Sequence, residues 1–465
     1  MQHIPTLSEL GRVHLLGIGG VGVSAVARLM LARGIPVSGT DAKDLPVLDE
    51  LRGLGARIHV GYAAANLGEV DTVVVSSVIK DGNPEYDAAK RRGLRILHRS
   101  EGLAATMKGD FVVAVCGTHG KTTTTSLIAV MLRHAGLSPS FAIGANVAGL
   151  GVNAELGAGR IFVAEADESD ASFLNYRPDV VVVTNVEADH LDHYGTAEAV
   201  HESFHRFVSL LPEDGLLICC ADDPGSHALA ARMRHERPDV RVQTYGFSES
   251  ADRRLLEAVP LAGQRYGCSL EWGSGEEGRL DLAVPGDHNL LNAAAAFAVG
   301  LDCGLQPEDA TLGLASFAGA ARRFEFRGEA AGVRVFDDYA HHPTEVLAAL
   351  KAARAVAGEG RVHVLFQPHL FSRTREFWRE FADALSLADT ALVLEIYPAR
   401  EQPIPGVTSE LVANALNTEG GAATRSAAPG LIAAVARPGD VVMTVGAGDV
   451  TEAGAEILAA LADRE

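Results

Sequence analysis

The sequence is poor in cysteine, and its few cysteines show no paired spacing. Cys116, Cys219, Cys220, Cys268 and Cys303 form no C-x-x-C motif and no regular framework. This pattern argues against a disulfide-stapled scaffold. We therefore expect buried free thiols and a cytoplasmic location.

Signal-like and membrane-like segments are also missing. The N-terminus lacks a basic segment followed by an apolar core, and no apolar run approaches the length that spans a bilayer. Cationic residues are too few to balance the acids, and the formal net charge is -20. Such a charge argues against non-specific binding to nucleic acid or to an anionic membrane surface. We expect no nucleic acid partner and no membrane insertion.

Aromatic residues are scarce, at 6% of the chain, whereas apolar residues as a whole make up 47%. Short Val, Ile and Leu runs alternate with Ala-rich helical stretches, as in parallel sheets built from βαβ units. The 465 residues exceed one ordinary core. We predict an α/β fold of three domains, with a central domain and two Rossmann-like outer ones, over 1–108, 109–318 and 319–465. A small antiparallel excursion is expected over 246–285, followed by a helix at "NLLNAAAAFAVGL".

The first glycine-rich segment is "VHLLGIGGVGVSAVARL", beginning at Val13. Gly17, Gly19 and Gly22 form a G-x-G-x-x-G array, and Asp41 follows a second apolar run. Alone, this pattern indicates a dinucleotide site and hence a dehydrogenase. A dehydrogenase would leave the features described next without a role.

A second glycine loop lies in "VVAVCGTHGKTTTT". An apolar strand runs into Gly117–Thr122, and a helical pattern follows. Glycines let backbone N–H groups turn toward phosphate oxygens, the Lys121 ammonium adds charge near the β- and γ-phosphates, and the Thr122 hydroxyl can ligate Mg²⁺. The standard P-loop spacing would place a glycine where this chain has Val115. The loop is therefore a variant that predicts a nucleoside triphosphate site.

Acidic clusters follow two apolar strands of the same region, in "FVAEADESDASF" and "VTNVEADHLDHYG". Open α/β sheets place ligands at the carboxyl ends of their strands. Mg²⁺ prefers oxygen ligands and keeps several waters. The sequence thus predicts a magnesium site whose protein ligands are one carboxylate, one hydroxyl and one histidine.

Eight segments in this order identify a family resemblance. They are "GTHGKTTTT", "EADESDASF", "NVEADHLDHYG", "PGDHNLLNAAAA", "ARRFEFRG", "DDYAHHPTE", "FQPHLFSRTRE" and "EIYPAREQPIPGVTS". The chain resembles the Mur ligases, and within them the branch that adds L-alanine, over essentially its whole length. The resemblance implies that ATP and Mg²⁺ are used to join L-alanine to the carboxylate of UDP-N-acetylmuramate, through an acyl phosphate, in peptidoglycan precursor synthesis. A monomer or weak homodimer is expected.

The resemblance also implies roles for individual residues. Lys121, His190 and Arg323 would be catalytic, and Thr122, Glu165 and His190 would hold the metal. The implied ATP site consists of Gly117, Thr118, His119, Gly120, Lys121, Thr122, Thr123, Asn289, Asn292, Arg323 and Asp338. Asn289 and Asn292 are three residues apart, so both amides should lie on one helix face.

The first domain of this family binds the UDP part of the substrate, which gives the first glycine loop a diphosphate to hold at a helix N-terminus. Asp41 would face either the loop or a ribose, and Arg99 would be either a phosphate contact or a surface helix cap. The implied UDP-sugar site consists of Gly17, Gly19, Gly20, Gly22, Asp41, Ser76, Ser77 and Arg99. The implied amino-acid side of the site consists of His341, His342, His369 and Arg373.

Two departures from the family pattern bear on specificity. Many relatives have an arginine where this chain has Leu370, so Arg373 would do more of the binding of the alanine carboxylate. Sister ligases that add later residues place a lysine after the "DH" motif, and none occurs from His190 to Pro212. We therefore expect no carbamylated lysine in that stretch, which favours the alanine-adding branch.

Other functions remain open from the sequence. A recycling ligase that attaches an intact tripeptide to the same UDP-sugar shares the motifs of the first two domains, although Ser169 stands where that enzyme tends to carry a bulkier aromatic residue. A non-catalytic nucleotide-binding regulator is the alternative from another class. Such a regulator would not need Lys121, Glu165, His190 and Arg323 together.

Overall fold

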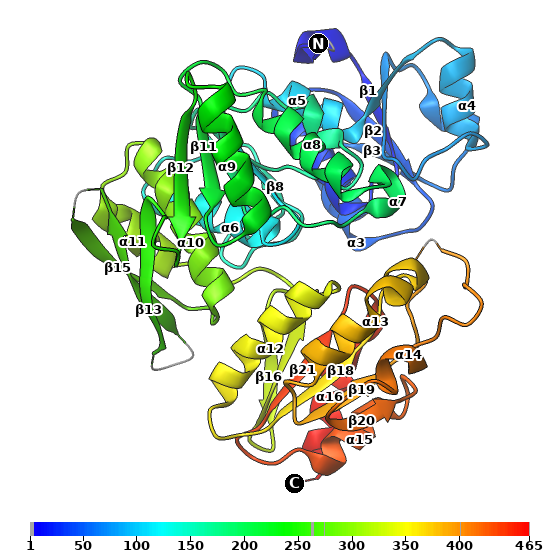
Figure 1. The fold of residues 1–465 in the computed structure, drawn as a ribbon. Helices are drawn as coiled ribbons and strands as arrows, with labels where there is room; N and C mark the ends of the chain where they lie inside the picture. Colours follow the sequence, from blue (N-terminus) through cyan, green and yellow to red (C-terminus); the bar gives the residue numbers. More distant parts are fainter. Residues whose placement is uncertain (1–3, 262–264, 274, 400, 465) are drawn as a thin grey trace. The chain divides into compact units, whose positions relative to one another are not determined.

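The fold was analysed in a computed structural model that describes residues 4–261, 265–273, 275–399 and 401–464. The predicted α/β class is confirmed, with three mostly parallel sheets (Figure 1). The described residues fall into two compact units. One unit contains the described parts of Met1–Leu256, Ser269–Leu280 and Leu291–Phe317, and the other those of Glu257–Cys268, Asp281–Leu290 and Ala318–Glu465.

The first sheet has the strand order β3-β2-β1-β4-β5. All four pairings are parallel, and the order reverses between β1 and β4, which is the switch point where such sheets bind ligands. The first glycine loop leaves the sheet at the end of β1. The strands are β1 (Val13–Leu16), β2 (Val37–Asp41), β3 (Arg57–Val60), β4 (Thr72–Val75) and β5 (Arg95–His98). The helices are α1 (Leu7–Leu10), α2 (Val21–Ala32), α3 (Pro46–Gly53), η1 (Ala64–Leu67), α4 (Pro84–Arg91) and α5 (Arg99–Met107).

The second sheet has the order β15-β14-β13-β12-β11-β10-β6-β9-β7-β8. Its centre is parallel, and the strands there are continuous apolar runs because both faces are covered. The strands are β6 (Phe111–Cys116), β7 (Ser140–Ala142), β8 (Ala154–Glu155), β9 (Ile161–Glu165), β10 (Val180–Val183), β11 (Leu216–Cys220) and β12 (Arg241–Gly246). The helices are α6 (Lys121–His134), η2 (Ser172–Asn175), α7 (Leu191–Tyr194), α8 (Ala197–Val208), α9 (Pro224–Glu236), α10 (Asp287–Asp302) and α11 (Pro307–Ala315).

The excursion expected over 246–285 forms strands at one end of this sheet. They are β13 (Arg253–Pro260), β14 (Tyr266–Trp272) and β15 (Glu276–Leu282), each the neighbour of the next. β13 pairs parallel with β12, which departs from the antiparallel arrangement expected for this excursion. The short connections from β13 to β14 and from β14 to β15 are typical of antiparallel neighbours. Residues 262–264 and 274, in the two connections, lie outside the described residues.

The third sheet has the order β16-β17-β21-β18-β19-β20, with β16 antiparallel and the others parallel. Helices cover both faces, so Val364 and Phe366 pack with one cluster while Leu365 packs with the other. Figure 1 shows α12 and α13 on one of these faces. The strands are β16 (Glu325–Ala330), β17 (Val333–Asp338), β18 (Val362–Phe366), β19 (Thr390–Val393), β20 (Glu419–Ala422) and β21 (Val441–Val445). The helices are α12 (Pro343–Ala357), α13 (Phe371–Leu385), α14 (Glu410–Ala413), α15 (Ala428–Val435), η4 (Asp449–Glu452) and α16 (Ala453–Ala462).

The cysteines of the chain are unpaired. All five cysteines are free, and all but Cys303 are buried, which confirms the expectation of free thiols. None of the helices within the described ranges is long and apolar enough to cross a membrane.

Candidate active site

The second glycine loop joins β6 to α6, in the strand–loop–helix order that the sequence predicts. Gly117 has a φ of +138° and Gly120 a φ of +79°, conformations that favour glycine. A Cβ on Gly117 would collide with the Thr184 hydroxyl, and one on Gly120 would lie 2.7 Å from Asn292 Oδ1. The loop therefore requires both glycines for conformation and for space, and the missing glycine at Val115 is not needed because Val115 lies within β6.

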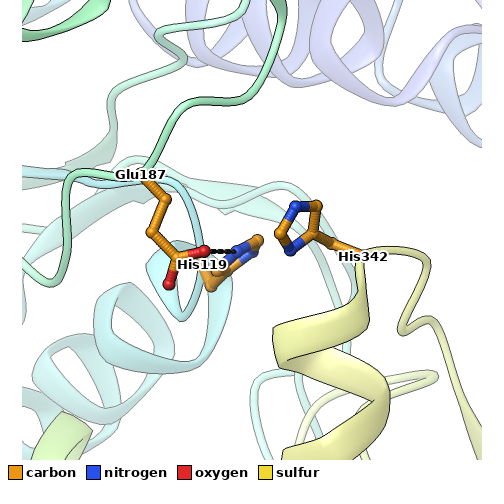
Figure 2. Close-up of side chains that lie close together, drawn as sticks. All are labelled: His119, Glu187 and His342. Carbon is orange, nitrogen blue, oxygen red and sulfur yellow. Dashed lines mark hydrogen bonds and ion pairs between the residues drawn. The ribbon is translucent and has the colours of Figure 1, made fainter. Parts of the chain in front are cut away.

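Residues that follow β10 hold this loop in place. Asn185 accepts the His119 backbone N–H at 2.7 Å and donates its own amide to the His119 carbonyl. Glu187 donates its backbone N–H to the Thr118 hydroxyl at 2.9 Å. Its carboxylate also lies 3.4 Å from His119 Nε2 (Figure 2). Asn185 was not predicted as a site residue, although it opens the quoted "NVEADHLDHYG" segment.

Lys121 forms a buried ion pair inside the loop. Its Nζ donates to Glu168 Oε1 at 2.8 Å and to the carbonyls of Gly117 at 2.7 Å and Thr118 at 3.1 Å. Burial raises the pKa of Glu168 to about 7, against the opposing effect of the Lys121 ammonium. Burial lowers the pKa of Lys121, but the carboxylates of Glu168 and Asp167 outweigh it and raise that pKa. Lys121 is thus charged at neutral pH and close to the backbone that would surround a phosphate.

Two of the three predicted metal ligands lie together. The Thr122 hydroxyl donates to Glu165 Oε1 at 3.2 Å, and Glu165 Oε2 accepts the Gly144 N–H at 2.8 Å. The hydroxyl and carboxylate oxygens are the ligand types that Mg²⁺ prefers, so this pair fits the ion. His190 is placed by other contacts, because its Nε2 lies 3.7 Å from Glu168 Oε1 and 3.8 Å from Asp189 Oδ2.

The helix α10 supplies the two predicted asparagines. Asn292 Oδ1 accepts the Thr124 hydroxyl at 3.1 Å, which brings this amide to the first turn of α6 beside Gly120. Asn289 Nδ2 donates to the Pro285 carbonyl at 2.6 Å. Both asparagines are buried, and so is Thr123 on α6.

The first glycine loop lies at the end of β1, and α2 begins directly after it at Val21. Asp41 Oδ2 accepts the Gly19 N–H at 2.9 Å, so of the two orientations left open this carboxylate faces the loop. A φ of +71° makes Gly17 the position of this loop that needs glycine for its conformation. Gly20 caps α2 through its backbone, and its own N–H donates to the Gly17 carbonyl at 3.0 Å.

Arg99 begins α5, and it also approaches the first glycine loop. A Cβ on Gly22 would lie 2.8 Å from Arg99 Nη1, while Arg99 Nη2 donates to Asp167 Oδ2 at 2.6 Å. His98, not Arg99, is the N-cap residue of α5, so the helix-cap interpretation of Arg99 is wrong. Ser76 and Ser77 follow β4, and the Ser77 hydroxyl donates to Asp170 Oδ2 at 3.2 Å.

The acidic segment Glu165–Asp170 therefore touches the second glycine loop directly and approaches the first one through Arg99. Glu165 and Glu168 contact Thr122 and Lys121 of the second loop. Asp167 and Asp170 contact Arg99 and Ser77, which follow the strands β5 and β4 of the first sheet. Burial raises the pKa of Asp167, but the positive charges of Arg99 and Lys121 outweigh it and lower that pKa to about 2. One six-residue stretch of chain thus places two potential phosphate sites next to each other.

In the other unit, the segment before β16 is fixed by the two aspartates that end β17. Arg322 Nε donates to Asp337 Oδ2 at 3.1 Å, and Asp338 Oδ2 accepts the Phe324 N–H at 2.8 Å. Arg323 lies between Arg322 and Phe324 in the sequence, and its guanidinium is 5.3 Å from the centre of the Tyr339 ring. Burial raises the pKa of Asp338 to about 6, against the opposing charge of Arg323.

The predicted amino-acid side lies along the carboxyl ends of β17 and β18. The His369 ring is 5.8 Å from that of His341 and stacks on Tyr397 at 5.9 Å. Burial lowers the pKa of His341 to about 4, which leaves its imidazole neutral at neutral pH. Arg373 is buried on α13. Tyr397, which the sequence analysis did not single out, lies in its "EIYPAREQP" segment.

His342 and Leu370 have backbone roles in the same unit. His342 begins α12 as its N-cap residue and forms a capping box with Glu345. Leu370 precedes α13 with a φ of +72°, a conformation that is uncommon for a residue with a side chain. Its N–H donates to the Tyr397 carbonyl at 3.0 Å.

Comparisons with known proteins agree with this geometry. Family descriptions match along the chain in three places: "Mur ligase family, catalytic domain" at 12–110, "Mur ligase middle domain" at 115–300 and "Mur ligase, glutamate ligase domain" at 322–448. The UDP-N-acetylmuramate–L-alanine ligase of Paenarthrobacter aurescens (strain TC1) is 61% identical over 98% of this chain and 99% of that protein. The protein of the same name from Thermobifida fusca (strain YX) is 50% identical over 98% of both.

Solved structures give the same answer. The UDP-N-acetylmuramate–alanine ligase of Thermotoga maritima matches with a TM-score of 0.80 and 28% identity, over 98% of this chain and 100% of that one. A murein peptide ligase of Psychrobacter arcticus 273-4 matches with a TM-score of 0.70 and 26% identity, over 97% and 99%. The identities and their coverage exceed what a shared fold alone would produce. The chain therefore belongs to the Mur ligase family.

Proposed function

We propose that this protein joins L-alanine to the carboxylate of UDP-N-acetylmuramate in an ATP-dependent reaction of peptidoglycan precursor synthesis. The observation that supports this function best is the acidic segment Glu165–Asp170, which contacts the second glycine loop and also holds Arg99 beside the first one. A ligase that activates a UDP-linked carboxylate with ATP needs its two phosphate sites side by side. The relatives that are 50% to 61% identical carry the corresponding name.

The reaction begins when the muramate carboxylate attacks the γ-phosphate of ATP, which forms an acyl phosphate and releases ADP. Phosphoryl transfer needs in-line positioning and neutralised charge. Lys121 supplies a fixed positive charge from within the loop, and the N-terminus of α6 adds its backbone N–H groups. Thr122 and Glu165 would hold Mg²⁺, which would supply positive charge to offset that of the phosphates.

The α-amine of L-alanine then attacks the acyl carbon, and the tetrahedral intermediate collapses to the amide and inorganic phosphate. The amine must lose its proton before or during this attack, and we propose that His190 influences this step. We assign Arg323 and Asp338 to the binding of ATP. The residues assigned to the amino-acid side are His341, His342, His369 and Arg373. We place the activity in the cytoplasm, where ATP is available.

Phosphate release from ATP tests this function directly. With UDP-N-acetylmuramate present, we expect release to depend on L-alanine and to be slower when the recycled tripeptide replaces it. We expect the tripeptide to react more slowly for two reasons. Ser169 stands where the recycling ligase tends to carry a bulkier aromatic residue, and the chain is 50% to 61% identical to L-alanine ligases. Faster turnover with the tripeptide would instead favour the murein peptide ligase activity. Absence of ADP formation with either acceptor would favour a nucleotide-binding regulator.

Replacing Thr122 by alanine should raise the Mg²⁺ concentration needed for half-maximal activity by at least about tenfold, since the loss of even an indirect ligand contact typically costs 10–100-fold in metal affinity. A Mg²⁺ titration of the rate at saturating ATP measures this. Thr125→Ala is the matched control, because that hydroxyl lies one turn later on α6 and donates to the Lys121 carbonyl at 2.8 Å. Equal shifts in both variants would count against Thr122 as a ligand.

A further inference from the structure

The ion pair between Arg99 and Asp167 joins the two phosphate sites. Arg99 is the first residue of α5, the helix that follows β5 of the first sheet, whereas Asp167 follows β9 of the second sheet. The Nη2–Oδ2 distance is 2.6 Å, and both side chains are at most about one-third exposed. Charge-assisted hydrogen bonds of this length are among the stronger ones in proteins.

The guanidinium presents its two terminal nitrogens to different partners. Nη2 is bound by Asp167, while Nη1 lies at Gly22 in the first turn of α2. An N-terminal helix turn that follows a glycine loop is where a diphosphate binds. A rigid planar fork can keep one nitrogen on a carboxylate and offer the other to a phosphate, which a lysine ammonium cannot do with the same geometry.

Asp167 is itself held by its own turn. Its Oδ1 accepts the Ser169 N–H at 3.1 Å, and its carbonyl accepts the Phe173 N–H at 3.2 Å. The carboxylate therefore has one oxygen for the turn and the other for Arg99. Because the same segment includes Glu165 at the end of β9 and Glu168, the position of Arg99 is tied to the segment that contacts the ATP loop.

We propose that Asp167 is a positioning residue that fixes Arg99 at the N-terminus of α2 for the diphosphate of the UDP-sugar. This inference rests on the proposed function and deepens it. Asp167 does not touch the substrate; it acts through Arg99. Its loss should weaken binding of the UDP-sugar and leave the affinity for ATP and the chemical step nearly unchanged.

The chain provides a matched control at the other end of α2. Arg33, the C-cap residue of α2, pairs with Asp110, the residue just before β6. Each ion pair connects a helix that covers the first sheet to a residue next to a strand of the second sheet. Both ion pairs are partly buried. They differ in that the Arg33 pair lies at the C-terminal end of α2, away from the glycine loop.

The experiment measures steady-state kinetics of the full-length protein with L-alanine, ATP and varied UDP-N-acetylmuramate. For Asp167→Asn, we expect KM for the UDP-sugar to rise about tenfold, which is the fold-change for losing one such interaction, with kcat and KM for ATP within about twofold. Asparagine keeps an oxygen for the Ser169 N–H, so the turn is retained. Asp110→Asn should leave all three constants unchanged.

Arg99→Lys supplies the second variant. It should raise the same KM, and the Asp167→Asn/Arg99→Lys double variant should be no worse than the poorer single variant, because both act through one contact. An unchanged KM in Asp167→Asn, or an equal rise in Asp110→Asn, would overturn the proposal. A wild-type protein that turns over no UDP-N-acetylmuramate would instead contradict the proposed function, so the two failures are distinguishable.

Discussion

Replacing Lys121 by alanine is expected to lower the rate of phosphate release from ATP by at least about 10²–10³-fold, the usual cost of removing one preorganised group that stabilises transition-state charge. The ammonium donates to two loop carbonyls and to Glu168, which places it within the loop that would surround the phosphates. The measurement is ADP formation at saturating UDP-N-acetylmuramate and L-alanine.

The same substitution should also destabilise the protein, and this effect must be separated from catalysis. Without Lys121, the Glu168 carboxylate stays buried at 2% exposure without its counter-charge. Removing one partner of a buried pair typically costs about 3–5 kcal/mol when the other partner stays charged, and uptake of a proton by Glu168, whose pKa is already raised to about 7, makes the loss smaller at neutral pH. Glu168→Gln in the Lys121→Ala background removes the unpaired charge while keeping the side-chain shape. We expect the double variant to regain thermal stability but not activity.

The activity and the thermal stability of these variants together distinguish the possible roles of Lys121. Recovery of activity together with stability would show that Lys121 is a structural partner of Glu168 and has no role in phosphoryl transfer. Full ADP formation in Lys121→Ala would contradict a role of Lys121 in catalysis. Full biological activity of this variant without ADP formation would favour the nucleotide-binding regulator over the ligase. Folded but inactive double variants would support the proposed chemistry.

Local patterns explain why much of the fold and part of the site could be predicted. β10 is a run of four valines buried on both faces, and the loop at Gly117 lies between a strand and a helix that each have a clear pattern. β3 and β20 have no such pattern, because they lie at the edges of their sheets and consist of exposed or glycine-rich residues. Their strands form through backbone pairing with a neighbour, which side-chain patterns do not report.

Contacts between distant residues were beyond prediction from the sequence. The sequence identified Arg99 as a possible phosphate contact and Asp167 as one acid of a cluster, but 68 residues separate the two. Asn185 and His119 are likewise joined only by the parallel pairing of β6 with β10. The positive φ of Leu370 is a further example, because nothing in its neighbours signals a turn that needs glycine.

The second large effect is expected for Gly120→Ala, which should weaken ATP binding by at least about tenfold, because a displaced loop loses a charge-assisted contact with the phosphates. Gly120 has a φ of +79°, and its added Cβ would lie 2.7 Å from Asn292 Oδ1. Gly136, at the other end of α6, has the same φ of +79° but open space around it. Gly136→Ala therefore isolates the conformational cost, about 1–2 kcal/mol, from the collision.

Equilibrium binding of ATP and the midpoint of thermal unfolding should be measured for both variants. We expect both midpoints to fall, with Gly120→Ala falling further, and ATP affinity to change only in Gly120→Ala. Asn292→Ala in the Gly120→Ala background removes the colliding oxygen, so its loss of stability should be smaller than the sum of the two single losses. Equal loss of ATP affinity in Gly136→Ala would show that helix stability, and not the shape of the loop, determines nucleotide binding. A purely additive double variant would show that the Gly120–Asn292 contact is not what requires glycine at this position.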